Sequence, residues 1–272
     1  MSLKSARERM RERQTLLEVG AKKSLGQNFL VSDSVIGKIL FEVRNQAPAS
    51  IVEVGPGLGA LTDGLIEMGL PLTLIELDTR LAAYWKEKNQ TVIEVDALQW
   101  SWDLSQLPRP CTLASNLPYQ ISSSMVVDRC LDEVPLDGMI LMFQKEVAQR
   151  MKATIHQGSY GFLSVIAQTF WKIELLLEAS SGDFFPPPKV ASRVLVFKPK
   201  PSPVANRRRY LKFLKASFLH PRKYLLSNLA EGWGVGKEAA RAKFIEGGWD
   251  PQIRGDQLTP EKFLELFRLF EG

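Results

Sequence analysis

A glycine-rich turn after a short apolar stretch restricts the fold of this chain more than any other feature. Residues 51–54 are mostly apolar, and the sequence then continues Gly-Pro-Gly-Leu-Gly, with Gly55, Gly57 and Gly59 two residues apart. Glycines allow a tight turn and let the backbone approach a ligand closely. The spacing differs from the G-x-G-x-x-G dinucleotide fingerprint. The pattern predicts a strand, a ligand-binding turn and a helix, although a turn without a ligand would have the same glycines.

Short apolar stretches alternate with segments of helical periodicity over the first 200 residues. The predicted strands are 51–54, 72–75, 91–95, 111–115, 139–143, 173–177 and 193–197. The predicted helices are 33–44, 60–68, 79–88, 122–131, 145–152 and 160–169. Such alternation is typical of an α/β fold with a mostly parallel, Rossmann-like sheet. The last two strands are separated by a proline-rich loop, so we expect an antiparallel hairpin at one end of the sheet.

The last 70 or so residues have a different character. Residues 198–203 contain three prolines, which favour an extended linker. Helical patterns follow at 207–219, 222–229, 237–245 and 260–269, with glycines between them. We therefore predict two domains: a sheet domain with a basic N-terminal arm, residues 1–200, and a small all-helical domain, residues 201–272.

Positive charge is concentrated in two segments of this 272-residue chain, whose net charge is +5. Residues 198–223 contain nine Lys or Arg and no acid, and the first 25 residues contain seven against three Glu. These segments are either solvated basic surface or contacts for nucleic-acid phosphates. Residues 1–24 are interpreted as a basic amphipathic helix or a disordered arm.

Two cysteines and two histidines are too few for a disulfide framework or a histidine-based metal centre, so no metal is expected. The sequence has no apolar run near the roughly 20 residues that cross a bilayer, and its start lacks the apolar core of a secretory signal. We expect a cytoplasmic protein, a monomer, with no membrane partner.

Two carboxylates follow predicted strands next to the glycine turn. Glu76 ends the second strand and Asp96 the third. The carboxyl ends of parallel strands form the ligand crevice, where an acid can accept from ribose hydroxyls and another from an adenine amine. No phosphate-binding lysine follows the glycines. A nucleoside without a polyphosphate fits best, and S-adenosylmethionine is the common ligand of this kind.

The tetrapeptide Asn116-Leu117-Pro118-Tyr119 comes directly after the fourth strand. The adenine N6 amine is a poor nucleophile because its lone pair is delocalised into the ring. The Asn116 side chain and the carbonyl of Leu117 or Pro118 can accept from that amine and direct its lone pair at a methyl donor. Tyr119 offers a face for stacking, worth about 1–3 kcal/mol per base. Positioning and electrostatics can carry such a transfer without a strong base.

The chain resembles the ribosomal RNA small-subunit adenine N6,N6-dimethyltransferase family over nearly its whole length. The matching motifs are SLGQNFL (24–30), EVGPGLGALT (53–62), IELD (75–78), Asp96-Ala97, NLPYQIS (116–122), QKEVAQR (144–150), YGFLSV (160–165) and FFPPPKVASRV (184–194). The resemblance implies cofactor contacts at Asn28, Leu30, Gly55, Glu76, Asp96 and Asn116, to which the turn adds Gly57. It also implies that Phe184 and Tyr119 clamp a flipped adenine.

The resemblance implies a substrate as well. Members of the family dimethylate two adjacent adenines in the 3′-terminal hairpin of 16S rRNA, late in the assembly of the small subunit. Immature 30S particles are therefore the expected partner. Three alternatives stay open: a large-subunit rRNA methyltransferase, in which Asn-Ile-Pro-Tyr is typical; a DNA adenine methyltransferase; and an RNA-binding assembly factor whose methylation is secondary. Pro110-Cys111 resembles a cytosine-methyltransferase nucleophile, but Cys111 begins an apolar strand and is interpreted as a buried core residue.

Overall fold

The computed structural model describes residues 4–18, 20, 28–201 and 204–271. Residues 24–27 of the SLGQNFL motif lie outside this part. By its contacts the chain divides into two compact units. The first consists of Met1–Ala148 and Ile173–Pro199, and the second of Gln149–Lys172 and Lys200–Gly272.

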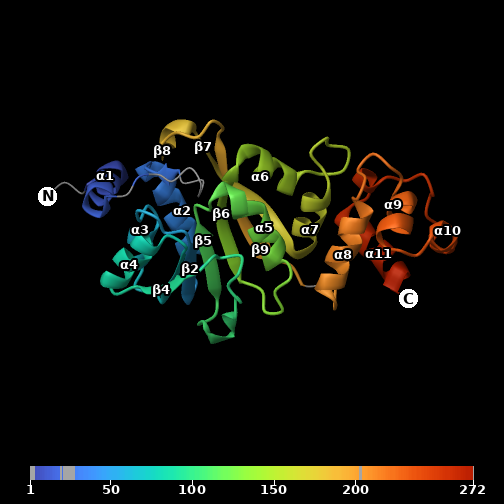
Figure 1. The fold of residues 1–272 in the computed structure, drawn as a ribbon, viewed down its shortest axis with the longest axis horizontal. Helices are drawn as coiled ribbons and strands as arrows, with labels where there is room; N and C mark the ends of the chain where they lie inside the picture. Colours follow the sequence, from blue (N-terminus) through green and yellow to red (C-terminus); the bar gives the residue numbers. More distant parts are fainter. Residues whose placement is uncertain (1–3, 19, 21–27, 202–203, 272) are drawn as a thin grey trace. The chain divides into compact units, whose positions relative to one another are not determined.

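A seven-stranded sheet forms the centre of the first unit (Figure 1). Its strand order is β4-β3-β2-β5-β6-β9-β7. The strands are β2 (Ser50–Val54), β3 (Leu72–Glu76), β4 (Thr91–Glu94), β5 (Cys111–Ser115), β6 (Gly138–Gln144), β7 (Trp171–Ala179) and β9 (Ser192–Pro199). Strands β4, β3, β2, β5 and β6 are parallel, and β9 is antiparallel to β6. The predicted mostly parallel, seven-stranded Rossmann-like sheet is confirmed.

Burial along the central strands explains why they form a parallel sheet. Every residue of β2, β3 and β5 is buried, as expected for strands covered on both faces. Cys111 is among them, fully buried at the start of β5, as the sequence predicts. The edge strand β4, by contrast, is only half-buried or exposed along its length. The most apolar segments of the chain therefore lie at the middle of the sheet.

Helices precede, connect or follow the strands of this sheet (Figure 1). They are α2 (Asp33–Asn45), α3 (Thr62–Ile66), α4 (Thr79–Glu87), α5 (Tyr119–Arg129) and α6 (Lys145–Lys152). Helix α5 begins at Tyr119, three residues before the predicted start. Pro118 is its N-cap residue with φ −54°, a value that proline's ring fixes and that suits the start of a helix. Helix α3 is shorter than predicted at both ends, because residues 60–61 and 67–68 are in turns.

Two features at the N-terminal side of the first unit complete it: a short strand pairing that was not predicted, and the helix that was one of two predicted alternatives. Residues 29–30 (β1, Phe29–Leu30) pair antiparallel with β8 (Phe184–Phe185), giving a separate two-stranded sheet. The N-terminal segment forms a helix, α1 (Ala6–Leu17), rather than a disordered arm. A capping box between Ser5 and Glu8 satisfies its first turn.

The second unit is helical. It contains α7 (Phe162–Phe170), α8 (Arg207–Ser217), α9 (Leu225–Gly232), α10 (Lys237–Glu246) and α11 (Pro260–Glu271). Helix α7 packs against α8 and α11, and the buried hydroxyl of Tyr160 donates to the Leu258 carbonyl at 2.6 Å. Residues 149–172, predicted as part of the sheet domain, therefore group with the helical unit by contacts. The functional division at residue 200 stays a prediction.

Candidate active site

A cavity of about 240 Å³ opens at the carboxyl ends of β2, β3, β4 and β5. Its lining contains every sequence-predicted cofactor residue: Asn28, Leu30, Gly55, Gly57, Glu76, Asp96 and Asn116. Leu117, Pro118 and Tyr119 line it as well. Residues from four strand ends and from the segment before α2 thus meet in one place, where Rossmann-like sheets hold their ligands.

The glycine turn has a backbone that other residues rarely adopt. Gly55, Gly57 and Gly59 have φ values of 67°, 54° and 84°. A Cβ atom on Gly55 would lie 3.6 Å from the Pro118 ring, so the turn lies directly against the Asn116–Tyr119 loop. The Gly57 carbonyl accepts from Trp85 Nε1 at 3.0 Å, which anchors the turn to α4. The two predicted halves of the site are therefore in contact.

Glu76, at the end of β3, is fixed by the backbone around it. Its carboxylate accepts from the Asp78 N–H at 2.9 Å and from the Gly57 N–H at 3.3 Å. Burial raises the pKa of the Glu76 carboxyl, and these backbone donors oppose that rise. The carboxylate is therefore preorganised at the cavity wall as a hydrogen-bond acceptor. Asp96 follows β4 and accepts from the Leu98 N–H at 2.9 Å.

Glu53 is a cavity residue that sequence reasoning missed. It is the last residue but one of β2, is 2% exposed, and its Oε2 has no hydrogen-bond partner among the described residues. Burial raises its pKa to about 8, the hydroxyl of Thr62 opposes the rise, and the nearby Asp63 and Glu76 add to it. A carboxyl group inside an apolar strand, just before a glycine turn, was the available signal.

Asn116 is oriented by a hydrogen bond across the cavity. Its Nδ2 donates to the Asn28 carbonyl at 3.1 Å, so its Oδ1 is left to act as an acceptor. The Pro118 carbonyl accepts from the Ile121 N–H at 3.1 Å, in the first turn of α5. The sequence offers the carbonyls of Leu117 and Pro118 as acceptors for the adenine amine. Because helix α5 already uses that of Pro118, the Leu117 carbonyl is the better candidate.

Tyr119 and Phe184 have different surroundings. The Tyr119 hydroxyl lies 2.8 Å from Ser192 Oγ on β9, which fixes the ring of a half-buried side chain at the cavity. Burial raises the Tyr119 pKa, so the phenol stays neutral. Phe184 is 2% exposed in the core and does not line the cavity. Its role in clamping a base stays a prediction.

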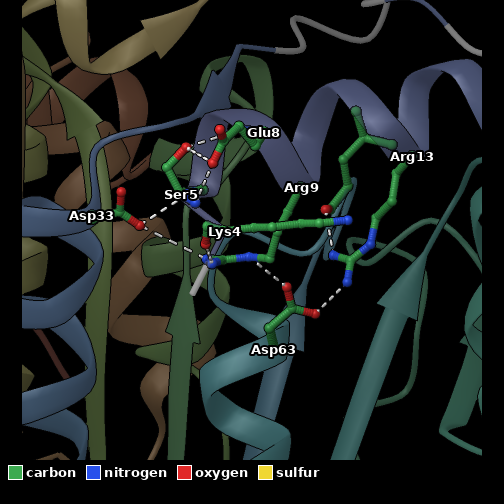
Figure 2. Close-up of polar contacts among 9 residues, drawn as sticks. Lys4, Ser5, Glu8, Arg9, Arg13, Asp33 and Asp63 are labelled. Carbon is green, nitrogen blue, oxygen red and sulfur yellow. Dashed lines mark hydrogen bonds and ion pairs between the residues drawn. The ribbon is translucent and has the colours of Figure 1, made fainter. Parts of the chain in front are cut away.

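Helix α1 supplies a wall of the cavity that the sequence did not predict. Ala6, Arg9 and Met10 line the cavity, and Ala6 and Met10 are buried. Figure 2 shows Arg9 and Arg13 reaching Asp63, at the start of α3, with Nε–Oδ2 and Nη2–Oδ1 distances of 3.2 and 2.7 Å. A helix with cations four residues apart was readable from the sequence, but its partner in α3 was not.

Within the described residues, no group of three or more His, Cys, Asp or Glu side chains is arranged to hold a metal ion. None of the helices in that part of the chain has the length and apolar character needed to cross a bilayer.

The sheet and its cavity define the chain as a Rossmann-like methyltransferase. The sequence pattern of the ribosomal RNA adenine dimethylase family matches residues 19–271, and the chain belongs to that family, whose members are rRNA adenine dimethyltransferases. It is 49% identical over 269 residues to the ribosomal RNA small subunit methyltransferase A of Bdellovibrio bacteriovorus, covering 97% of this chain and 98% of that one. The Syntrophotalea carbinolica protein of the same name is 36% identical, with coverages of 92% and 97%.

Two solved structures have the same fold. A dimethyladenosine transferase from Plasmodium falciparum has a TM-score of 0.73 at 23% identity, covering 89% of this chain and 97% of its own. A 23S rRNA methyltransferase has a TM-score of 0.63 at 25% identity, with coverages of 90% and 100%. One of these structures is named for 23S rRNA, whereas the relatives above are named for the small subunit, so the fold cannot by itself identify the substrate RNA.

Proposed function

We propose that this chain transfers methyl groups from S-adenosylmethionine to the N6 amines of two adjacent adenines in the 3′-terminal hairpin of small-subunit rRNA, on immature 30S particles. The 49% identical relative named as a small-subunit methyltransferase supports this substrate over large-subunit RNA. Leu117, where large-subunit enzymes typically have isoleucine, agrees with it. A monomer acting in the cytoplasm stays an expectation.

The order of side chains along one sheet edge is the observation that carries the proposal. The strand order β4-β3-β2-β5 brings Asp96, Glu76, Gly55 and Asn116 into a row. The donor has its groups in the matching sequence: adenine, ribose, the sulfonium and amino-acid part, and the methyl to be transferred. Asp96 would accept from the adenine amine, Glu76 from the ribose hydroxyls, and the Gly55–Gly57 backbone would lie against the remainder.

The charges of the cavity also fit this donor. Glu53 Oε2 is buried and has no hydrogen-bond partner among the described residues, so it can accept a hydrogen bond from a ligand. The ammonium group of S-adenosylmethionine can donate that hydrogen bond. When bound, S-adenosylmethionine would supply an activated methyl. No phosphate-binding lysine follows the turn, as it does in loops that bind a nucleotide polyphosphate.

The residues opposite the donor would hold the target amine. Asn116 Oδ1, oriented by its bond to Asn28, and the Leu117 carbonyl would each accept one N–H of N6. Two acceptors at fixed positions turn the nitrogen lone pair toward the donor, and Tyr119 would stack on the base ring. An adenine inside a duplex must leave its stack to reach this loop.

The second unit offers cations for RNA phosphates. Arg208, Lys212 and Lys215 on α8 are exposed, as are Arg222 and Lys223 in the following turn. Contacts of this kind bind the nucleic-acid backbone without reading its sequence. We therefore assign this unit a role in RNA binding.

Methyl transfer to ribosomal particles tests the proposal. Small-subunit particles lacking the modification, and large-subunit particles, would be incubated with labelled S-adenosylmethionine, and the rRNA digested to nucleosides. We expect N6,N6-dimethyladenosine in small-subunit RNA only. Asn116→Ala should lower the rate at least about 100-fold, as loss of a transition-state hydrogen bond does elsewhere, whereas Gln106→Ala, an exposed amide on the 3₁₀ turn Leu104–Gln106, should not.

Dimethyladenosine found only in large-subunit RNA would refute the substrate, and none in either would refute the reaction. The same variant separates enzyme from assembly factor. If cells with Asn116→Ala mature their small subunits normally while methylation is lost, RNA binding is the primary role.

A further inference from the structure

Charge is unevenly distributed over the cavity. Among the described residues that line it, four have carboxyl groups, Asp63, Glu76, Asp96 and Glu53, whose pKa of about 8 keeps it protonated at neutral pH, and only Arg9 is a cation. S-adenosylmethionine has two positive groups, an ammonium and a sulfonium, and a single negative one, its carboxylate. The lining therefore has more acids than cations, and the ligand has more positive groups than negative ones. The two match in charge.

Arg9 is held on the glycine-turn side of the cavity. Its Nε pairs with Asp63 at 3.2 Å, its Nη1 donates to the Lys4 carbonyl at 2.6 Å, and its Nη2 lies 3.9 Å from Asp33 Oδ1 (Figure 2). Arg13 secures the same side by donating to the Leu58 carbonyl at 2.7 Å. Leu58 belongs to the turn that follows β2, so Arg9 lies where the amino-acid part of the donor is expected.

The guanidinium of Arg9 keeps capacity for a ligand. Its Nη2 makes no hydrogen bond within the described residues, since 3.9 Å to Asp33 is an ion-pair distance only. The side chain is 31% exposed, so an anion entering the cavity can reach it. A hydrogen bond from this charged nitrogen to a carboxylate is stronger than one between neutral groups.

Arg9 lies outside the sequence pattern of the family, which matches from residue 19 onward. Helix α1, residues 6–17, precedes the part that this pattern matches and forms part of the cavity wall. A residue contributed by this helix is not among those that the family motifs assign.

We propose that Arg9 is a cofactor-positioning residue that receives the carboxylate of the methyl donor. The proposal rests on the proposed use of S-adenosylmethionine. Three observations support the proposal. Arg9 is the single cation among the described residues of an acid-rich lining, it lies beside the glycine turn, and its Nη2 makes no hydrogen bond within the described residues. Helix α1 thereby adds the negative-group subsite to a cavity whose strand ends serve the nucleoside.

Calorimetric titration of the full chain with two ligands tests this. The ligands are S-adenosylhomocysteine, which has the carboxylate, and its decarboxylated analogue, in which hydrogen replaces that group. We expect the wild-type chain to bind the first about tenfold or more tightly than the second, as for hydrogen bonds between charged groups. Arg9→Met should bring this ratio close to 1 through weaker binding of S-adenosylhomocysteine, with the analogue's affinity nearly unchanged. Arg9→Lys should keep part of the preference.

A matched control lies on the same helix. Arg11 is exposed, so Arg11→Met removes the same charge from α1 outside the cavity and should keep the wild-type ratio. If Arg9→Met keeps that ratio, or weakens both ligands equally because α1 loosens, the proposal is overturned. If the wild-type chain binds neither ligand, the proposed function fails as well, which separates the two failures.

Discussion

Replacing Glu53 by glutamine should change how the stability of this protein depends on pH. Burial raises the pKa of Glu53 from an ordinary 4.5 to about 8 in the folded chain. Between these values the folded state keeps a proton that the unfolded state releases, so the stability of the wild-type chain falls as pH rises through this window. Glutamine has the same shape and cannot ionise, so Glu53→Gln lacks this loss.

The magnitude follows from the two pKa values. Each pH unit between them changes the free energy of unfolding by about 1.4 kcal/mol, and the full window corresponds to about 5 kcal/mol, to order of magnitude. Relative to the wild type, Glu53→Gln should therefore gain about 3–4 kcal/mol from pH 5 to pH 8 and level off above that. Below pH 4.5 the difference between the two chains should be constant.

Urea unfolding followed by tryptophan fluorescence, without cofactor, would measure this difference at several pH values. Glu94→Gln is the control, because Lys86, whose Nζ lies 2.7 Å from Glu94, lowers the pKa of that exposed carboxyl. Its stabilising effect is present above pH 4.5 and is lost only below it, so this variant should run parallel to the wild type from pH 5 to 8. Parallel curves for Glu53→Gln as well would refute the reasoning.

Three further outcomes are expected. Gly59→Ala should destabilise the fold by about 1–3 kcal/mol in urea unfolding, because φ is 84° there and the new Cβ would meet Arg13 and lie 2.8 Å from the Trp85 ring; an unchanged midpoint would contradict this. Tyr119→Ala should lower kcat/KM for rRNA about 5- to 100-fold through lost stacking, and Ser192→Ala, which removes only the partner of the hydroxyl, should lower it less; equal effects would count against stacking. RNA affinity should fall steeply with salt, its logarithm by about 0.7 per single-strand phosphate contact for each tenfold rise in concentration, and a flat response in a filter-binding assay would exclude the basic segments as phosphate contacts.

Most strands of the sheet could be predicted because strands buried on both faces are apolar along their whole length. Residues 111–115 and 139–143 are buried on both faces, and a short apolar run between helical patterns has few other interpretations. The cavity followed from topology, because residues at successive carboxyl ends of parallel strands must meet. Glu76, Asp96 and Asn116 were found in this way.

Other features left no local signal. The pairing of Phe29–Leu30 with Phe184–Phe185 involves two residues on each side, too few for any periodicity. The ion pair between Arg13 and Asp63 joins residues fifty positions apart. The grouping of 149–172 with the helical unit depends on which surface α7 packs against, and an apolar helix face does not name its partner. All three features depend on contacts between residues that are far apart in the sequence, and local propensity and periodicity do not determine such contacts.

Because its lining comes from four different strand ends, the cavity of the candidate active site needs β4, β3, β2 and β5 to be paired. A ligand that binds there is linked to the integrity of the whole sheet rather than to one loop. At a concentration one hundred times its dissociation constant, such a ligand would stabilise the folded state by about 2.7 kcal/mol. With S-adenosylmethionine as that ligand, its concentration in the cell would influence how readily this enzyme unfolds. At a low concentration of the methyl donor, the enzyme would unfold more easily.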